Sequence, residues 1–218
     1  MMPIRLNNKD FKPLEEQPYQ YILAANGLFL AKENRVFRAV VKVEPGPELG
    51  LLPLQETIEL KAIRIPFAWV YRAVQFFRAV YKAHVTEAFL WVVLDPQTNS
   101  VSLACPKQKN YVGHVHAEED PEIPDDLLKI GDIHSHLCGS FHSSGDVEDE
   151  KFGDGIHIVV GNLDAPVPDF TASLVVKGCR RRLEPGQVME LEFGFDHGWM
   201  RKIQPDKKTL FSQLWSRR

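Results

Sequence analysis

Residues 131–146, GDIHSHLCGSFHSSGD, hold most of the side chains in this chain that suggest chemistry. His134 and His136 follow the short, partly apolar run of residues 128–133, as at the end of a strand. Alternate residues of a strand share a face, so both imidazoles can reach one ion. A carboxylate from the next element would complete a three-ligand site with one open position, which is the arrangement of catalytic zinc.

The expected carboxylate is Asp146. Ser143 and Ser144 precede a polar stretch of good helix formers, residues 147–151, so a helix should begin near one of these two serines. Ser143 and Asp146 have the spacing of a capping box, in which the serine and an acid three residues later fix the first helical turn. That turn would aim Asp146 at the metal.

A long helix and a buried strand should precede this stretch. Pro66 suits the first position of a helix, and an apolar stripe then predicts that the helix ends near Ala83 or His84. The stripe consists of Phe67, Val70, Val74, Phe77 and Tyr81. Residues 85–94 form an apolar run with Glu87 near its start, which is typical of a buried strand with a polar group at its entrance.

This pattern resembles the MPN domain with a JAMM zinc motif, the fold of metallo-isopeptidases that remove ubiquitin-like proteins. The residues that match the motif are Glu87, His134, His136, Ser143 and Asp146. Within the family, the chain is most similar to the protein A group of PRTRC cassettes, which are plasmid-borne bacterial gene groups that also encode ParB-related and ThiF-related proteins. The likeness covers about residues 60–195 and also rests on Phe141, on the acids after Asp146 and on residues 155–161, GIHIVVG.

The resemblance implies an α/β fold with a mixed sheet flanked by helices, and a zinc-dependent peptidase or isopeptidase. Zinc would be held by His134, His136 and Asp146. Glu87 would be the general base that takes a proton from water and delivers it to the leaving amine, and Ser143 would donate a hydrogen bond to the oxyanion. The implied substrate is a small ubiquitin-like protein cut near its C-terminus, with a ThiF-like activating enzyme as a further candidate partner.

Two features depart from the family pattern. Only six residues, 137–142, separate His136 from Ser143, one fewer than usual, and Leu137 stands where many members have proline. Either the loop is tighter or Ser144 takes the place of Ser143. Since a misplacement of about an ångström can cost roughly a hundredfold in rate, a non-catalytic MPN scaffold that binds proteins is the alternative, and a metal-binding structural protein is a third interpretation.

Several polar residues can also be explained by structural roles that involve no chemistry. Without the resemblance, Glu87 reads equally well as an exposed glutamate at a strand end. His114 and His116 alternate on an expected strand with acids after them, but the prolines that follow favour a solvated, extended loop. Asp132 shares the strand face of His134, so it either orients that ligand or lies at the surface. His157, in an apolar strand, is expected to be a core histidine with its hydrogen bonds satisfied.

The cysteines and His142 give no organised site. Cys105, Cys138 and Cys179 are odd in number and widely spaced, so neither a disulfide framework nor a structural zinc knuckle is expected. Cys138 could be a nucleophile with His142 as base, but nothing in the sequence would orient such a pair. The motifs of zinc nucleobase deaminases and of helical His-Glu-x-x-His metalloproteases are missing from the sequence.

Composition limits the classes of partner. The 26 basic and 29 acidic residues give a net charge of −3, so there is no overall basic footprint for nucleic acid. A local basic cluster, Lys177 with Arg180, Arg181 and Arg182, is expected to be solvated. No apolar stretch is long enough to span a bilayer, and residues 1–10 lack the layout of a signal peptide. The expected location is the cytoplasm.

Three regions are expected along the chain, and at 44% hydrophobic residues it can bury a substantial core. Residues 1–60 should form a small β-rich extension, because apolar segments at 19–24, 27–31 and 36–43 resemble a β-meander. Residues 61–195 should form the MPN-like domain, with strands near 87–94, 100–105, 156–161 and 170–177. Residues 196–218 form a tail with a short amphipathic helix, which would dock on the body or on a partner.

Overall fold

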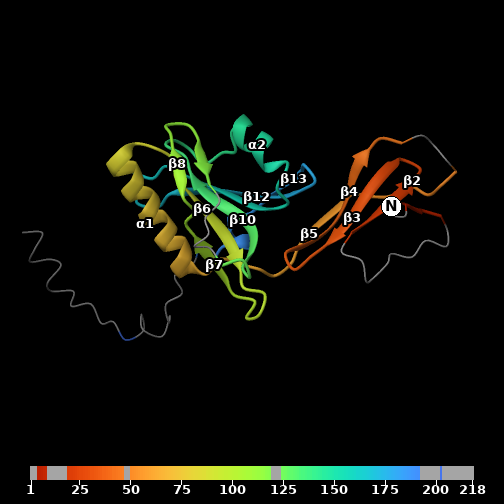
Figure 1. Ribbon diagram of the computed structural model, residues 1–218, viewed down its shortest axis with the longest axis horizontal. Helices are drawn as coiled ribbons and strands as arrows, with labels where there is room; N and C mark the ends of the chain where they lie inside the picture. Colours follow the sequence, from red (N-terminus) through yellow and green to blue (C-terminus); the bar gives the residue numbers. More distant parts are fainter. Residues whose placement is uncertain (1–3, 9–18, 47–49, 119–123, 192–201, 203–218) are drawn as a thin grey trace, which may run out of the picture.

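The computed structural model describes residues 4–8, 19–46, 50–118, 124–191 and 202, and within them the fold is mixed α/β with sheets dominating (Figure 1). A five-stranded sheet has the order β1-β2-β3-β4-β5. Its strands are β1 (Ile4–Leu6), β2 (Tyr19–Ala24), β3 (Gly27–Glu33), β4 (Phe37–Glu44) and β5 (Thr57–Leu60). The predicted meander is therefore present as β2, β3 and β4, and it gains one strand on each side.

The second sheet has six strands in the order β13-β12-β11-β10-β6-β7. Its strands are β6 (Phe89–Leu94), β7 (Val101–Ala104), β10 (Leu128–Ser135), β11 (Gly155–Gly161), β12 (Asp169–Val176) and β13 (Cys179–Leu183). The neighbours β10 and β11 are parallel, and the other pairs are antiparallel. A separate hairpin, β8 (Gln108–Asn110) with β9 (Val115–Ala117), lies between β7 and β10 in the chain.

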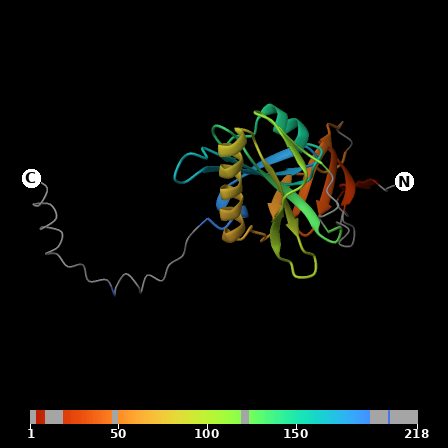
Figure 2. The same ribbon diagram turned by 60° about the vertical axis from the view of Figure 1, so that its left-hand side comes forward.

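The long helix α1 (Phe67–His84) has the bounds that its apolar stripe predicts. Pro66, expected at the first helical position, is instead the N-cap, and the helix ends at His84. The C-cap residue Val85 adopts the left-handed conformation and donates its backbone N–H to the Tyr81 carbonyl. Its buried residues are Val70, Ala73, Val74 and Phe77. Figure 2 shows α1 lying across the six-stranded sheet, and the five-stranded sheet lies at the other end of the molecule.

The six-stranded sheet has two different faces. On β10 and β11, Ile133 and Ile158 belong to the same hydrophobic core as Phe77 of α1. The residues that alternate with them, Asp132 and His157, are buried polar groups that pair across the two strands. Successive strand residues point to opposite faces, so one face packs on α1 and the other presents polar groups.

The five-stranded sheet shares the main core rather than forming a wholly separate one. Phe37 and Val41 of β4 are fully buried in the core cluster that contains α1. Lys32 of β3 also forms an ion pair with Asp154, with 2.5 Å between Nζ and Oδ2. A second, smaller cluster of Ile22, Ala24 and Phe29 lies within the five-stranded sheet itself.

Several local predictions need correction. The strand expected at 85–94 begins only at Phe89, so Glu87 precedes it. His114 lies in the turn of the β8–β9 hairpin, and His116 alone is on a strand. In the basic cluster, Lys177, Arg181 and Arg182 are exposed as expected, but Arg180 is partly buried and forms an ion pair with the buried Glu150.

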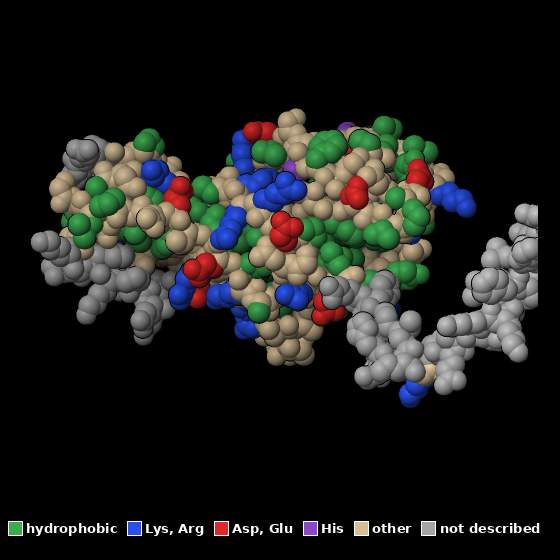
Figure 3. Space-filling view, turned by 180° about the vertical axis from the view of Figure 1, so that it is seen from behind, with side chains coloured by type: hydrophobic (Ala, Val, Ile, Leu, Met, Phe, Trp, Pro, Cys, Tyr) green, Lys and Arg blue, Asp and Glu red, His purple; other side chains and the backbone are tan. Residues whose placement is uncertain are grey.

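The remaining elements are short helices, α2 (Ser144–Glu150) and α3 (Pro185–Val188). The expected tail helix lies outside the described residues. Within the described part of the chain, no helix is both long enough and apolar enough to cross a membrane. Seen from behind, hydrophobic side chains gather toward the end that carries α1, and Lys and Arg side chains gather between that end and the five-stranded sheet (Figure 3).

Candidate metal centre

His134 and His136 lie at the end of β10, held against its two neighbours. Gly131 lets β10 approach β11 closely, since it has a φ of +155° and a Cβ there would lie 1.8 Å from the Ile156 carbonyl oxygen. The backbone N–H of His136 donates to the Val160 carbonyl at 2.9 Å, which continues the β10–β11 pairing past the last residue of the strand. Both histidines are therefore positioned by sheet backbone.

The loop 137–142 leaves His136 and crosses the end of β11. A Cβ at Gly161 would lie only 2.2 Å from the Ser140 backbone nitrogen, so the loop passes where only glycine leaves space. The Asn162 backbone N–H donates to the Cys138 carbonyl at 3.1 Å, which fastens the loop to β11. The shortened loop is accommodated in this way.

Asp146 lies in the first turn of α2, and Ser143 is the N-cap residue. The Ser143 backbone N–H donates to Asp146 Oδ2 at 2.6 Å, and the Asp146 backbone N–H donates to Ser143 Oγ at 3.2 Å. Both bonds of a capping box are present, as the Ser-x-x-Asp spacing predicts. The box holds the carboxylate against the start of its own helix.

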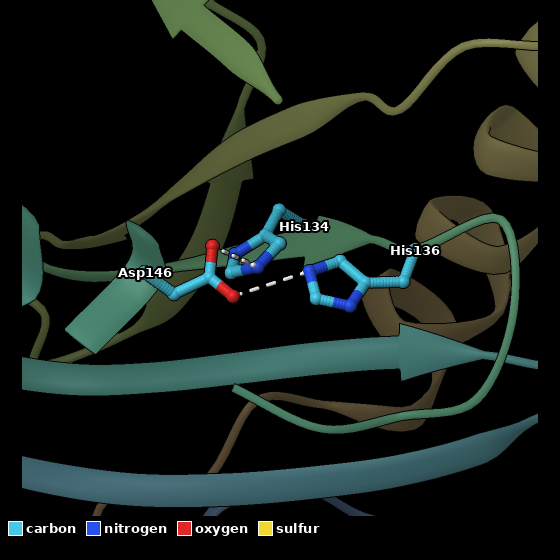
Figure 4. Close-up of side chains that lie close together, drawn as sticks. All are labelled: His134, His136 and Asp146. Carbon is cyan, nitrogen blue, oxygen red and sulfur yellow. Dashed lines mark ion pairs between the residues drawn. The ribbon is translucent and has the colours of Figure 1, made fainter. Parts of the chain in front are cut away.

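Figure 4 shows the three side chains converging. His134 Nε2 lies 3.5 Å from Asp146 Oδ1, and His136 Nε2 lies 3.2 Å from Asp146 Oδ2. One ligand atom from each of the three residues lies within 4.8 Å of the others. Two imidazole nitrogens and one carboxylate oxygen are donors that zinc prefers, and three protein ligands leave a fourth position open.

A buried atom without a partner supports the fit to a metal. His134 Nε2 has no hydrogen-bond partner in the structure although it is fully buried. A buried polar atom is normally paired, because leaving it unpaired costs about 1–3 kcal/mol. A cation bound between His134, His136 and Asp146 would satisfy this atom.

The pKa values of His134 and Asp146 reflect how close these side chains lie to one another. Burial by itself would lower the pKa of His134, but its hydrogen bond to Asp132 and the nearby carboxylate of Asp146 raise that pKa to about 10. Burial would raise the pKa of Asp146, yet the close imidazoles of His134 and His136 bring it well below its usual range. The two imidazoles and the carboxylate are therefore electrostatically coupled across the position that a cation would take.

Asp132 orients His134 from behind. Its Oδ1 lies 3.2 Å from His134 Nδ1, and its Oδ2 lies 2.5 Å from Nδ1 of His157. His157 Nε2 in turn donates to the Gly153 carbonyl at 3.1 Å, so His157 is a buried histidine with both nitrogens bonded. The bond to Asp132 places the proton of His134 on Nδ1, which leaves Nε2 as the atom that faces Asp146.

Glu87 is fixed beside the ligand strand although it lies just before β6. Its backbone N–H donates to the Tyr111 carbonyl at 3.0 Å, and its carbonyl accepts from Asn110 Nδ2 at 2.6 Å. The next residue, Ala88, exchanges hydrogen bonds with Ser135: its N–H donates to Ser135 Oγ at 3.0 Å, and its carbonyl accepts from the Ser135 N–H at 2.9 Å. The residue between the two histidine ligands thus ties the ligand strand to the Glu87 segment.

Glu87 is buried, so it is not the exposed glutamate at a strand end that the sequence also allowed. Burial raises its pKa, and the nearby His136 and His134 oppose that rise. A carboxyl whose pKa is moved upward is suited to accept and return a proton near neutral pH. Such a shift is common at functional sites.

A cavity of about 250 Å³ joins these groups. Its lining includes Glu87, His134, Ser143 and Asp146, with Phe89, Trp91 and His114 on another side. Ser143 contributes to the lining, whereas Ser144 is exposed and does not. Of the two serines that the sequence leaves open, Ser143 is the one that lines the cavity with His134 and Asp146.

The structure also brings in residues that sequence reasoning did not select. Asn110 and Tyr111 come from the β8–β9 hairpin, and Glu150 and Arg180 come from α2 and β13. Arg180 was noted only as part of a basic cluster and Glu150 only as one of the acids after Asp146, and no local signal joins the two. Ser135 could have been noted, because it occupies the position between the two histidines.

The other candidate residues give no second site in the part of the chain that the structure describes, although His114 lines the same cavity. His114 and His116 are exposed, and among the described residues neither belongs to a group of side chains that could hold a metal. His114 instead stacks on Tyr111, with 4.2 Å between ring centroids. Cys105 and Cys138 are exposed, Cys179 is partly buried, and these three cysteines form no disulfide.

Comparisons with known proteins add little. No protein-family model matches the chain, and no curated protein matches it. Among solved structures, the chain is similar to the solution structure of protein DSY2949 from Desulfitobacterium hafniense. That similarity covers 62% of this chain and 96% of the other at 15% sequence identity, with a TM-score of 0.44, and it carries no argument about fold or function.

Proposed function

We propose that this protein is a zinc-dependent metallopeptidase or isopeptidase of the MPN/JAMM type, which cleaves a peptide or isopeptide bond near the C-terminus of a small ubiquitin-like protein. The observation that carries the proposal is the convergence of His134, His136 and Asp146 around the buried Nε2 of His134, which no hydrogen bond satisfies. Glu87 and Ser143 line the same cavity. The peptidase class and the substrate come from the resemblance to the JAMM motif.

The ligand set suits the proposed metal. Zinc, when bound by His134, His136 and Asp146, would supply Lewis acidity that acidifies a water molecule and polarises the carbonyl of the bond to be cut. Asp132 keeps Nε2 of His134 turned toward the site through its bond to Nδ1. The capping box keeps Asp146 at the start of α2.

Glu87 would hold and move the proton. Its buried carboxyl, with a raised pKa, would accept a proton from the attacking water and later give it to the leaving amine. Ser143 uses its oxygen to accept from the Asp146 N–H, so its own hydroxyl proton is available to donate to the carbonyl oxygen as negative charge develops there. These roles follow the order of the motif along the chain.

The size of the cavity agrees with an extended substrate terminus. A volume of about 250 Å³ takes a short piece of chain and not a folded domain. A folded ubiquitin-like protein would therefore have to present an extended tail to the site. A ThiF-like activating enzyme is the further partner that the cassette resemblance implies.

The first test is metal stoichiometry, by elemental mass spectrometry on protein purified without chelators. The native chain and the exposed-histidine control His116→Ala should each carry one equivalent of zinc, and His136→Ala and Asp146→Ala should carry none. Native protein that takes up no zinc, even when zinc is supplied, would overturn the proposal.

Glu87→Gln separates catalysis from the alternative, a non-catalytic MPN scaffold that the shortened loop 137–142 favours. With a linear fusion of a cassette ubiquitin-like protein to a reporter peptide as the probe, Glu87→Gln should keep its zinc and lose cleavage. If the native protein binds the fusion without cleaving it, and Glu87→Gln binds it equally well, the scaffold function is the correct one.

A further inference from the structure

The helix that carries Asp146 has almost no apolar attachment to the rest of the protein. All seven residues of α2 are described, and Glu150 alone among them is buried. Val147 is exposed, and so is Phe152 just after the helix. An isolated helix of seven residues is unstable in water, so its attachment to the body must come from tertiary contacts.

Glu150 supplies that attachment at the last turn of α2. The residue is 7% exposed, and both of its carboxylate oxygens are used. Oε1 lies 3.1 Å from His142 Nδ1, and Oε2 forms an ion pair with the guanidinium of Arg180. Arg180 also donates to Ser173 Oγ at 2.5 Å, which connects the pair to β12.

His142 connects Glu150 to the loop that begins at the ligand His136. It lies in the loop 137–142, and its side chain is 9% exposed. Glu150 also comes within 4.0 Å of His157, whose Nε2 bonds the Gly153 carbonyl just after α2. Contacts from the loop, from β11 and from β13 therefore meet at the C-terminal end of a helix whose N-terminal end holds Asp146.

We propose that Glu150 is a positioning residue for the metal ligand Asp146, and that His142 and Arg180 are the groups that hold Glu150. The inference rests on the proposed metal site. The capping box orients Asp146 relative to α2, but it does not orient α2 relative to β10. The Glu150 contacts do so, and they include a residue of the shortened loop, so the loop and the helix are set together.

The chain offers matched controls for a test. Glu148 lies on the exposed side of the same helix, where it forms an ion pair with Lys151. Arg182 lies on the same strand as Arg180 but is exposed. The variants to compare are Glu150→Ala, Glu150→Gln and Arg180→Met, with Glu148→Ala and Arg182→Met as controls.

Zinc dissociation constants would be measured by competition with a chromophoric chelator, and the ligand geometry by the visible absorption of the cobalt-substituted protein. Glu150→Ala and Arg180→Met should weaken zinc binding by about 10- to 100-fold and alter the cobalt bands, as loss of outer groups does in other metal sites. Glu150→Gln should recover part of the affinity, because the amide oxygen can still accept from Arg180. The two controls should stay within about twofold of the native protein.

Folded Glu150→Ala and Arg180→Met proteins with native zinc affinity and native cobalt bands would overturn the inference. If Glu150→Ala does not fold, Arg180→Met decides, since it leaves the Glu150–His142 bond in place. If the native chain binds no zinc, the proposed function fails. Amide hydrogen exchange across α2, measured with a chelator present, then tests separately whether Glu150 holds the helix on the sheet. Faster exchange in Glu150→Ala than in Glu148→Ala supports that role of Glu150, and equal exchange refutes it.

Discussion

The two faces of the six-stranded sheet are built from the same strands but are stabilised differently. On β10 and β11, Ile133 and Ile158 are fully buried on the face that packs on α1. Asp132, His134 and His157 are each 5% exposed on the opposite face. Apolar burial is non-directional, whereas a buried charge is tolerated only with a well-placed partner. Similar burial therefore gives stability on one face and defined geometry on the other.

The largest expected effect concerns the apolar face. Phe77→Ala removes a fully buried ring that packs against the sheet, and it should lower the free energy of unfolding by about 3–5 kcal/mol. The measurement is urea unfolding with a chelator present. The adjacent, partly buried Phe76 is the matched control, and Phe76→Ala should cost less. Equal losses would show that the full burial of the Phe77 ring against the sheet adds nothing to its contribution.

Asp132→Asn tests the polar face. The variant should weaken zinc binding by about 10- to 100-fold, or about 1.4–2.8 kcal/mol, because the single amide oxygen cannot accept from both His134 and His157 as the two carboxylate oxygens do. Chelator competition measures the change. Asp169→Asn on β12, outside the cavity lining, is the control and should bind zinc as the native protein does. Native affinity in Asp132→Asn would remove Asp132 from the site.

The apparent free energy of zinc binding should change by about 1.4 kcal/mol per pH unit. Because the pKa of His134 is raised to about 10, zinc must displace its proton at neutral pH. Apparent affinity should therefore rise by up to about tenfold per unit between pH 7 and 9, as one proton is released per ion. Calorimetry in buffers of different ionisation enthalpy would count the proton. Zinc binding without proton release would contradict the raised pKa.

The metal-free protein should show the linked effect on stability. The raised pKa of His134 stabilises the fold below the ordinary histidine pKa of about 6.5, and this contribution is lost as pH rises toward 10. The pKa values of Asp132 and Asp146 are lowered, so their contribution is present above about pH 3.9 and is lost on acidification. Both contributions are present between about pH 4 and 6.5, where urea unfolding in chelator should show their joint maximum.

The smallest expected effect compares two neighbouring serines. Ser143→Ala removes the N-cap of α2 and should lower the free energy of unfolding by about 1 kcal/mol. Ser144→Ala, in the exposed first position of the helix, should change it by less than about 0.5 kcal/mol. Thermal unfolding of the metal-free proteins measures both. A larger loss in Ser144→Ala would assign the cap to the other serine.

Periodicity and capping chemistry predicted the elements that depend on local rules. The bounds of α1, the start of α2 and the order of the main strands all follow from patterns of apolar residues and from Ser143 and Asp146. β13 was missed, because a run of three arginines looks like a solvated segment. It forms a strand since it pairs with β12, which no local pattern reveals.

The sequence by itself determined which residues can act chemically: two alternating histidines, a capping aspartate and a glutamate in an apolar run. Strand alternation and helix capping are short-range effects, so they can be read from neighbouring residues. Only the tertiary structure decided that Glu87 lies buried beside the ligands, that Asp132 turns toward His134, and that Glu150 holds α2 on the sheet. Those contacts join segments far apart in the chain or depend on burial, and burial exists only once the sheet and helices have packed together.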